Sequence, residues 1–224
     1  MSLVGSKRRR LKVDFHIHSD FSMDGNMSPE EIIDLAKKLG LDAIAVTDHN
    51  SVEGGKETEK LAKGLIVFVG SEIKTESGEI IGLNLKEDIP SDLTLAQTCK
   101  LIKEQGGFVL VPHPFDKMRR GVGKGIEKIV RYIDAVEVFN ARTLLDRFNK
   151  NASKFAEEHK LPKVAGSDAH FGAELGSAYT FVYSEKQKDK ILEAVKGGKT
   201  KIFGGKTGVL PHWKTFVTKM GRRF

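Results

Sequence analysis

The strongest constraint on the fold is a regular alternation, along most of the chain, between short apolar segments and segments with helical periodicity. Apolar runs predict strands at 13–17, 43–46, 65–69, 108–111, 135–139, 163–165, 179–182 and 201–203, with a hairpin between 73 and 85. Helices are predicted between them at 29–39, 52–62, 93–104, 126–132, 143–159 and 187–195. Strand–helix units with nearly continuous apolar strands favour a parallel sheet in an α/β protein.

Six or seven such units within one domain-sized chain favour a closed βα-barrel, short of the usual eight units. A doubly wound open sheet is the alternative. The first strand is followed by neither a Gly-x-Gly-x-x-Gly loop nor a Walker-type loop, which weakens a nucleotide-binding version of that alternative.

Composition excludes several other classes of protein. Hydrophobic residues make up 39% and charged residues 30% of the 224 residues, which argues against fibrous and disordered chains. No apolar run approaches the roughly 20 residues that span a bilayer, and the N-terminus lacks the apolar core of a secretory signal. Cys99 is the single cysteine, so it can form neither an internal disulfide nor a cysteine zinc site, and we expect it to be a buried helix residue. A cytoplasmic location fits these features best.

Basic residues exceed acidic ones, giving a net charge of +7 that suits an anionic substrate, phosphate first. The excess gathers near the two ends of the chain, at 7–10 and at Lys214, Lys219, Arg222 and Arg223. We therefore expect basic tails at 1–11 and 204–224, the second being part of the same domain or poorly ordered. They are either solvated tails or attract nucleic acid.

Polar residues gather where the predicted strands end. They are His16 and His18, Asp48 and His49, Ser71 and Glu72, His113, Asn140 and Arg142, and Ser167, Asp168 and His170. In a βα-barrel the C-terminal ends of the strands meet on one face, where active sites lie. The sequence therefore predicts that these side chains converge on one mouth.

The residue types at this mouth match metal coordination by imidazole and carboxylate, with zinc, manganese or iron as candidate ions. Side chains alternate along a strand, so His16 and His18 point the same way. Taken alone, such a pair is equally a cross-strand or surface pair. Because five of the seven histidines fall at strand ends beside carboxylates, that reading does not explain the cluster as a whole.

Several residues keep alternative interpretations. Asp24 is a ligand candidate, but it also fits an Asp–Gly turn, and Asp20 is close enough to substitute for it. Asp48 is a ligand or a partner that orients a histidine. Glu79 is a ligand or a solvated strand residue, and His159 fits an exposed or helix-capping position.

The chain resembles the PHP family, named for polymerase and histidinol phosphatase, over about residues 12–203. The resemblance rests on the motifs at 14–20, 45–50, 70–72, 112–114, 136–142 and 166–170. It implies a distorted seven-stranded βα-barrel, TIM-like, in which two or three divalent metal ions (Zn, Mn or Fe) hydrolyse phosphoesters.

The resemblance also implies ligand sets. The first metal, which would hold the catalytic hydroxide, would be bound by His16, His18, Glu72 and Asp168. The second would be bound by Asp24, His49 and His170. Glu72 would bridge to a third, completed by His113 and one further ligand. In many relatives that ligand is a histidine, and the matching position here is Glu79. Glu79 either completes a more anionic third site, favouring harder ions such as manganese, or leaves two metals.

We expect in-line attack on a phosphate ester by a metal-activated hydroxide, since a bound metal lowers the pKa of water towards about 7. Arg142, then Arg119 and Arg120, are the candidate phosphate-binding residues, although the last two also fit a solvated loop. The expected partner is a phosphorylated small molecule or nucleotide. The alternatives are a nuclease acting on nucleic-acid ends and a non-catalytic metal-binding regulatory module. The sequence leaves the oligomeric state open.

Overall fold

The computed structural model describes residues 8–208 together with Thr215 and Thr218. The predictions for residues 1–7, for His212 and for most of the basic C-terminal tail therefore lie outside the described residues. Within the described part of the chain, no helix is long and apolar enough to cross a membrane.

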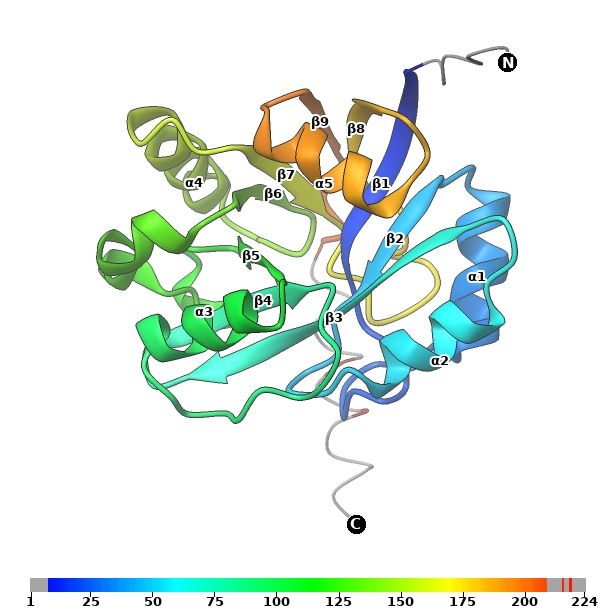
Figure 1. Ribbon diagram of the computed structural model, residues 1–224, viewed down its shortest axis with the longest axis horizontal. Coiled ribbons are helices and arrows are strands. Elements are labelled where there is room, and N and C mark those ends of the chain that lie inside the picture. Colours follow the sequence, from blue (N-terminus) through cyan, green and yellow to red (C-terminus); the bar gives the residue numbers. More distant parts are fainter. Residues whose placement is uncertain (1–7, 209–214, 216–217, 219–224) are drawn as a thin grey trace, which may run out of the picture.

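One sheet of nine strands organises the molecule (Figure 1), in the spatial order β7-β6-β5-β4-β3-β2-β1-β8-β9. The strands are β1 (Arg9–Ile17), β2 (Ala43–Val46), β3 (Ile66–Thr75), β4 (Gly78–Leu83), β5 (Phe108–Val111), β6 (Ala135–Asn140), β7 (Lys163–Gly166), β8 (Ala178–Ser184) and β9 (Thr200–Gly204). Parallel pairing joins β1 to β2, β2 to β3, β5 to β6 and β6 to β7. The pairs that involve β4, β8 and β9 are antiparallel.

The sheet curls until its first and seventh strands nearly meet. A bridge between Ile17 and Ala169 and a hydrogen bond from His18 N to Ala169 O (2.8 Å) join the ends of β1 and β7. The predicted α/β class and barrel-like arrangement are confirmed. The sheet has nine strands, not the seven that the family resemblance implies, because β8 and β9 continue it as an antiparallel pair beside β1.

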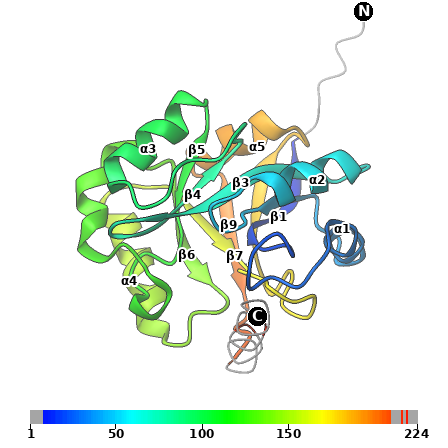
Figure 2. The same cartoon turned by 90° about the horizontal axis from the view of Figure 1, so that it is seen from below.

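Helices flank the sheet on two sides (Figures 1 and 2): α1 (Pro29–Lys38) and α2 (Glu53–Leu61) on one, α3 (Leu95–Glu104) and α4 (Asp146–Glu158) on the other. The predicted start of α1 is confirmed, since the Ser28 side chain accepts a hydrogen bond from Glu31 N and Pro29 opens the helix. The predicted helix at 126–132 is a 3-10 helix that begins at Gly123. The helix predicted to start at 143 begins at Asp146.

The barrel interior is apolar below the mouth. Leu11, Val13 and Phe15 of β1 lie there with Phe68 and other buried strand residues. The helix α5 (Lys188–Lys196) adds Ile191, Leu192, Ala194 and Val195 to the same cluster. The histidines of the mouth lie above this apolar cluster, at the ends of their strands.

β1 begins at Arg9, four residues before the predicted strand, because the segment 9–13 pairs with β8 from Ser184 to Thr180. The basic residues Arg9 and Arg10 thus belong to the sheet, although the sequence places them in an N-terminal tail. The register of β1 against β2 shifts between Asp14 and Ile17. Such an irregularity re-aims side chains, and here Phe15 and His16 are both fully buried.

Candidate metal centre

Four side chains form the innermost part of the mouth, and we call them the inner quartet: His16, His18, Glu72 and Asp168. They come from the ends of β1, β3 and β7 and are at most 1% exposed. His16 Nε2 lies 3.1 Å from His18 Nε2, and these atoms lie 3.4 and 3.3 Å from Glu72 Oε2. Asp168 Oδ1 lies 3.6 and 3.5 Å from the same two nitrogens.

The spacings among His16, His18 and Glu72 fit one metal ion, and Asp168 Oδ1 lies within 3.6 Å of the same two imidazole nitrogens. Tetrahedral ligands at 2.0–2.2 Å from a zinc ion stand about 3.4 Å from each other, as geometry requires of these bond lengths. The five contacts of the inner quartet fall between 3.1 and 3.6 Å. Within the described residues, the buried Asp168 Oδ1 has no hydrogen-bond partner, so its lone pairs are available to a cation.

Electrostatics in the quartet also favour a cation. Burial alone raises the pKa of Asp168, but Arg119 and His16 outweigh burial and hold that pKa well below its usual value. Burial lowers the pKa of His18, yet hydrogen bonding to Asp168 and Glu72 raises it to about 9. The carboxylates thus stabilise positive charge at this point, whether protons or a metal ion carry it.

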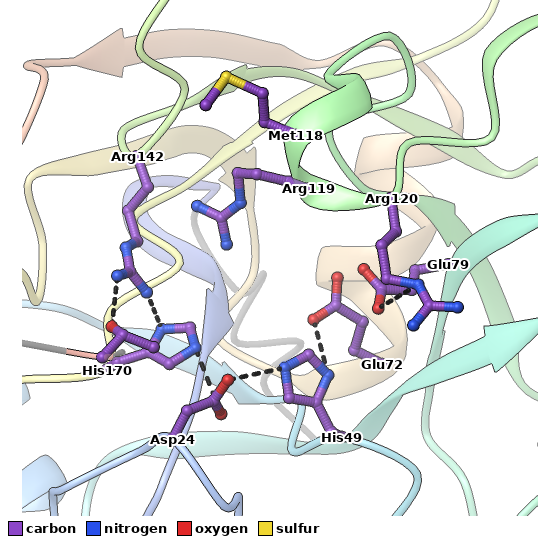
Figure 3. Close-up of a pocket in the computed structure, with 10 residues that line it drawn as sticks. Asp24, His49, Glu72, Glu79, Met118, Arg119, Arg120, Arg142 and His170 are labelled. Carbon is purple, nitrogen blue, oxygen red and sulfur yellow. Dashed lines mark hydrogen bonds and ion pairs between the residues drawn. The ribbon is translucent and has the colours of Figure 1, made fainter. Parts of the chain in front are cut away.

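A second cluster lies beside the quartet and contains Asp24, His49 and His170. Asp24 Oδ2 lies 3.6 Å from His49 Nε2, and Asp24 Oδ1 lies 3.6 Å from His170 Nε2 (Figure 3). His18, His49 and His170 together could hold an ion. Asp24 is 5% exposed, whereas Asp20 is an exposed loop residue, so the geometry favours Asp24 over Asp20 in this cluster.

A third cluster, which we call the outer corner, contains Glu79 and His113 next to Glu72. His113 Nε2 lies 3.0 Å from Glu72 Oε1, and Glu72, Glu79 and His113 could hold an ion. Burial and then the charge of Glu72 raise the pKa of Glu79 to about 8. Glu79 is only 8% exposed and points towards the mouth, which argues against the solvated-strand alternative.

The backbone is strained at two of these positions. Asp168 has φ of +55° and His113 has φ of +26°, in the left-handed region that non-glycine residues rarely adopt. Such conformations persist where the surrounding structure fixes them, and they cluster at functional sites. Close packing adds a further constraint at Gly166, where a Cβ atom would lie 2.5 Å from His16 Cβ and 2.6 Å from Glu137 Oε1.

Glu137 is a site residue to which sequence reasoning gave no role. Its Oε1 lies 3.1 Å from His16 Nδ1, and its Oε2 accepts hydrogen bonds from His113 N (2.8 Å) and Asn140 Nδ2 (2.9 Å). Asn140 also donates to Asp168 Oδ2 at 2.8 Å. The sequence does contain a hint, since Glu137 is an acidic residue within the apolar strand 135–139. A carboxylate that is fully buried, as this one is, needs hydrogen-bond partners.

Asp48 acts on the site through a serine. Its carboxylate accepts hydrogen bonds from Ser19 N (2.7 Å), Ser19 Oγ (2.6 Å) and Ser22 Oγ (2.9 Å). Ser22 Oγ lies 3.2 Å from His18 Nδ1. This geometry favours the second interpretation of Asp48, a residue that orients a histidine and holds the loop after β1.

The three candidate phosphate-binding arginines line a pocket of about 210 Å³ above these clusters (Figure 3). Arg119 contacts Asp168, Arg120 Nε lies 3.7 Å from Glu79 Oε1, and Arg142 lies beside His170. Glu174 also holds Arg142, since Glu174 Oε1 lies 3.2 Å from Arg142 Nε. Arg119 and Arg142 are largely buried, whereas the Arg120 side chain is 54% exposed, so the solvated-loop alternative fits Arg120 only.

Two residues lie outside the mouth, as expected. His159 caps the end of α4, stacks on Phe155 at 4.2 Å and lies 3.4 Å from Glu127. Cys99 is fully buried in α3, and burial raises the pKa of its thiol to about 12. Neither is placed to act on a ligand in the mouth.

Comparison with known proteins agrees with the motifs. The model of the PHP-associated family matches residues 146–200. An uncharacterized protein of Methanocaldococcus jannaschii is 34% identical over 233 aligned positions, covering 96% of this chain and 92% of the relative. A 5'-3' exoribonuclease of Haemophilus influenzae is 35% identical over 100 residues, covering 42% of this chain and 36% of the relative.

Among solved structures, a two-domain protein of Bacteroides vulgatus contains a predicted PHP-like metal-dependent phosphoesterase. It matches with a TM-score of 0.75 and 23% identity, over 94% of this chain and 70% of that chain, which supports the fold. Together with the near full-length relative and the family match, these comparisons establish that the chain belongs to the PHP family.

Proposed function

We propose that this protein is a metal-dependent phosphoesterase that cleaves a phosphate ester of a small molecule or nucleotide at the mouth of the barrel. The inner quartet carries the proposal, because His16, His18 and Glu72 stand at the mutual spacing of metal ligands and Asp168 lies beside both imidazoles. The cluster of Asp24, His49 and His170 would hold a second ion, and the outer corner a third.

When bound, the metal ions supply a nucleophile by lowering the pKa of a coordinated water, and they neutralise charge on the phosphoryl oxygens. The chain's own residues bind and orient the substrate. Arg142 and Arg119 point into the pocket, where their planar guanidinium groups match the oxygens of a phosphate. Glu174 fixes Arg142 by an ion pair, so this donor is oriented before substrate arrives.

Glu137 and Ser22 act on the imidazoles. Glu137 Oε1 can accept the Nδ1 proton of His16, which leaves Nε2 free to ligate. Ser22, held by Asp48, is placed to do the same for His18. Thus each histidine of the quartet has a partner that selects the nitrogen facing the mouth.

The test is a substrate panel with the full chain loaded with manganese or zinc. It contains p-nitrophenyl phosphate, its bis-ester, nucleoside monophosphates and short labelled RNA and DNA. We expect hydrolysis of a phosphate ester by the wild-type protein and none by Asp168→Ala, which serves as the control for contaminating phosphatases. The proposal fails if metal is verified as bound and no phosphoester is cleaved, which would favour a non-catalytic regulatory module.

The second candidate is a nuclease that acts on nucleic-acid ends. The similarity to the exoribonuclease of Haemophilus influenzae favours it, although that match spans only part of both chains. Cleavage confined to oligonucleotides would select this candidate. Cleavage of mononucleotides or p-nitrophenyl phosphate at comparable kcat/KM would select the small-molecule phosphoesterase.

A further inference from the structure

The outer face of the antiparallel strands β1, β8 and β9 has an unusual composition. Its outward positions are Arg10 and Lys12 on β1, Tyr179, Phe181 and Tyr183 on β8, and Lys201 and Phe203 on β9. The pairing confirms that they share one face, since Lys12 lies opposite Phe181 and Tyr179 opposite Phe203. All seven positions are aromatic or cationic, and we call this surface the aromatic–basic face.

The opposite positions on the same strands behave differently. Leu11, Val13, Thr180 and Val182 point inward and are at most 1% exposed. The helix that follows β8, α5, packs on the interior cluster instead of covering the outer face. The C-terminal end of α1 reaches one edge of this side, where Leu39 O accepts a hydrogen bond from Lys12 Nζ and Tyr179 packs beside the apolar cluster of α1. Tyr183 and Phe203 remain exposed beyond it. An antiparallel sheet tolerates such exposure, but its solvent face normally carries mixed polar residues.

Three of the four aromatic rings of this face, those of Tyr179, Phe181 and Phe203, form a connected layer. Tyr179 and Phe203 stack with their ring centroids 4.6 Å apart, and Tyr179 meets Phe181 edge-on at 5.2 Å. Phe203 and Tyr183 remain 52% and 43% exposed. Scattered exposed aromatic residues need no explanation, but a contiguous layer marks an interaction surface.

The cations lie within the same layer. The Arg10 guanidinium lies 4.5 Å from the Phe181 ring centroid, and Lys12 Nζ lies 4.1 Å from that of Tyr179. Lys201 lies on β9 opposite Phe181. Arg8 and Arg9, both exposed, extend the positive charge at the start of β1. Asp14, two residues after Lys12 on β1, is fully buried and accepts hydrogen bonds from Ser167 N and Gly176 N. Asp42 and Glu185 lie off the strands, and Asp42 pairs with Lys186.

We propose that the aromatic–basic face binds single-stranded nucleic acid. Exposed rings on a sheet accept unstacked bases, and interleaved cations neutralise the phosphates that join them. A duplex fits poorly because its bases are already stacked and hidden from the rings. The aromatic–basic face would hold the nucleic-acid strand outside the mouth of the barrel, so binding there does not require hydrolysis. This proposal can therefore be tested independently of the proposed phosphoesterase activity.

The experiment measures fluorescence anisotropy of labelled 12-nucleotide RNA and DNA with the full chain, with a chelator present to prevent hydrolysis. We expect Tyr183→Leu and Phe203→Leu, which keep apolar bulk but remove the ring, each to weaken binding about five-fold or more. Lys201→Ala should lower the slope of log K against log salt by about one. The exposed control variant Lys100→Ala on α3, which removes a charge of the same sign away from the face, should bind like wild type.

Thermal unfolding of each variant separates loss of binding from loss of folding, since all three substituted side chains are exposed. The proposal is overturned if the wild type does not bind single strands at micromolar concentration. Equal binding by the ring variants and wild type, or equal affinity for duplex and single strand, overturns it as well. Sedimentation that reveals a dimer disrupted by Phe203→Leu, with oligonucleotide binding unchanged, would assign the face to self-association instead.

Discussion

The inner quartet and the outer corner share Glu72 but differ in how completely the protein has prepared them for a metal. In the inner quartet, ligand atoms already stand at coordination spacing, and Glu137, Asn140 and Ser22 fix side chains from behind. In the outer corner, His113 Nε2 lies 3.0 Å from Glu72 Oε1, and burial and the charge of Glu72 raise the pKa of Glu79. We therefore expect a first ion to find a preorganised site, whereas a third ion would have to complete its own site.

The largest effect should follow from removing a member of the inner quartet. We expect Asp168→Ala and His16→Ala each to lower kcat/KM by about three orders of magnitude or more, since metal-dependent charge stabilisation is worth several kcal/mol. Elemental analysis should show loss of metal in parallel. Near-normal rates in either variant would contradict the assignment of the quartet.

Substitution of Arg119, beside the inner quartet, should impair activity more than substitution of its neighbour Arg120, beside the outer corner. Arg119 is buried beside Asp168, whereas Arg120 is exposed beside Glu79. We expect Arg119→Ala to lower kcat about 10²- to 10³-fold, the usual cost of removing one oriented donor to developing charge. Arg120→Ala should change KM by less than about ten-fold because an exposed charge contributes little. Similar losses of activity in Arg119→Ala and Arg120→Ala would contradict the different roles assigned to the two arginines.

Glu137→Gln should weaken metal binding about 10- to 100-fold, the range typical of partners behind a ligating histidine. The carboxylate accepts from three donors, and an amide can satisfy them only partly. Calorimetric titration of the metal-free protein with Mn²⁺ measures the effect, and the His16 Nδ1 proton in ¹⁵N-resolved NMR of the zinc form reports its cause. Thr180→Val is the control, since Thr180 Oγ1 accepts a buried hydrogen bond from Ala165 N away from the mouth. Unchanged affinity with a lowered melting temperature would reduce Glu137 to a structural role.

The smallest effect is expected at the outer corner itself. Glu79→Ala should remove at most one metal equivalent by elemental analysis and leave the inner ion bound, because none of the quartet contacts involves Glu79. Glu79→His, which restores the residue found in many relatives, should keep the metal count of the wild type. A metal count unaffected by Glu79→Ala would show that Glu79 is not a ligand and would favour a site that holds two metals.

The sequence predicted the α/β alternation and the residues of the mouth because both depend on local pattern. Apolar runs that end in His, Asp or Glu locate strand ends, and parallel strands bring those ends together. The seven strands that the family resemblance implies are not confirmed, because the sheet has nine. The apolar runs at 179–182 and 201–203 had already predicted the two additional strands, β8 and β9. Glu137 received no role because hydrogen bonds across 121 residues, as between Glu137 and His16, leave no local pattern.

By itself, the sequence predicted which residues would carry the chemistry: histidines and carboxylates at strand ends, with Glu79 where the family resemblance implies a histidine. Tertiary structure alone decided their partners and their spacing. It placed Asp168 Oδ1 within 3.6 Å of two imidazoles about 150 positions earlier in the chain, and it left Tyr183 and Phe203 exposed on the outer side of β8 and β9. The physical reason is that coordination and exposure depend on distances of a few ångströms between distant segments, and only the closing of the sheet fixes those distances.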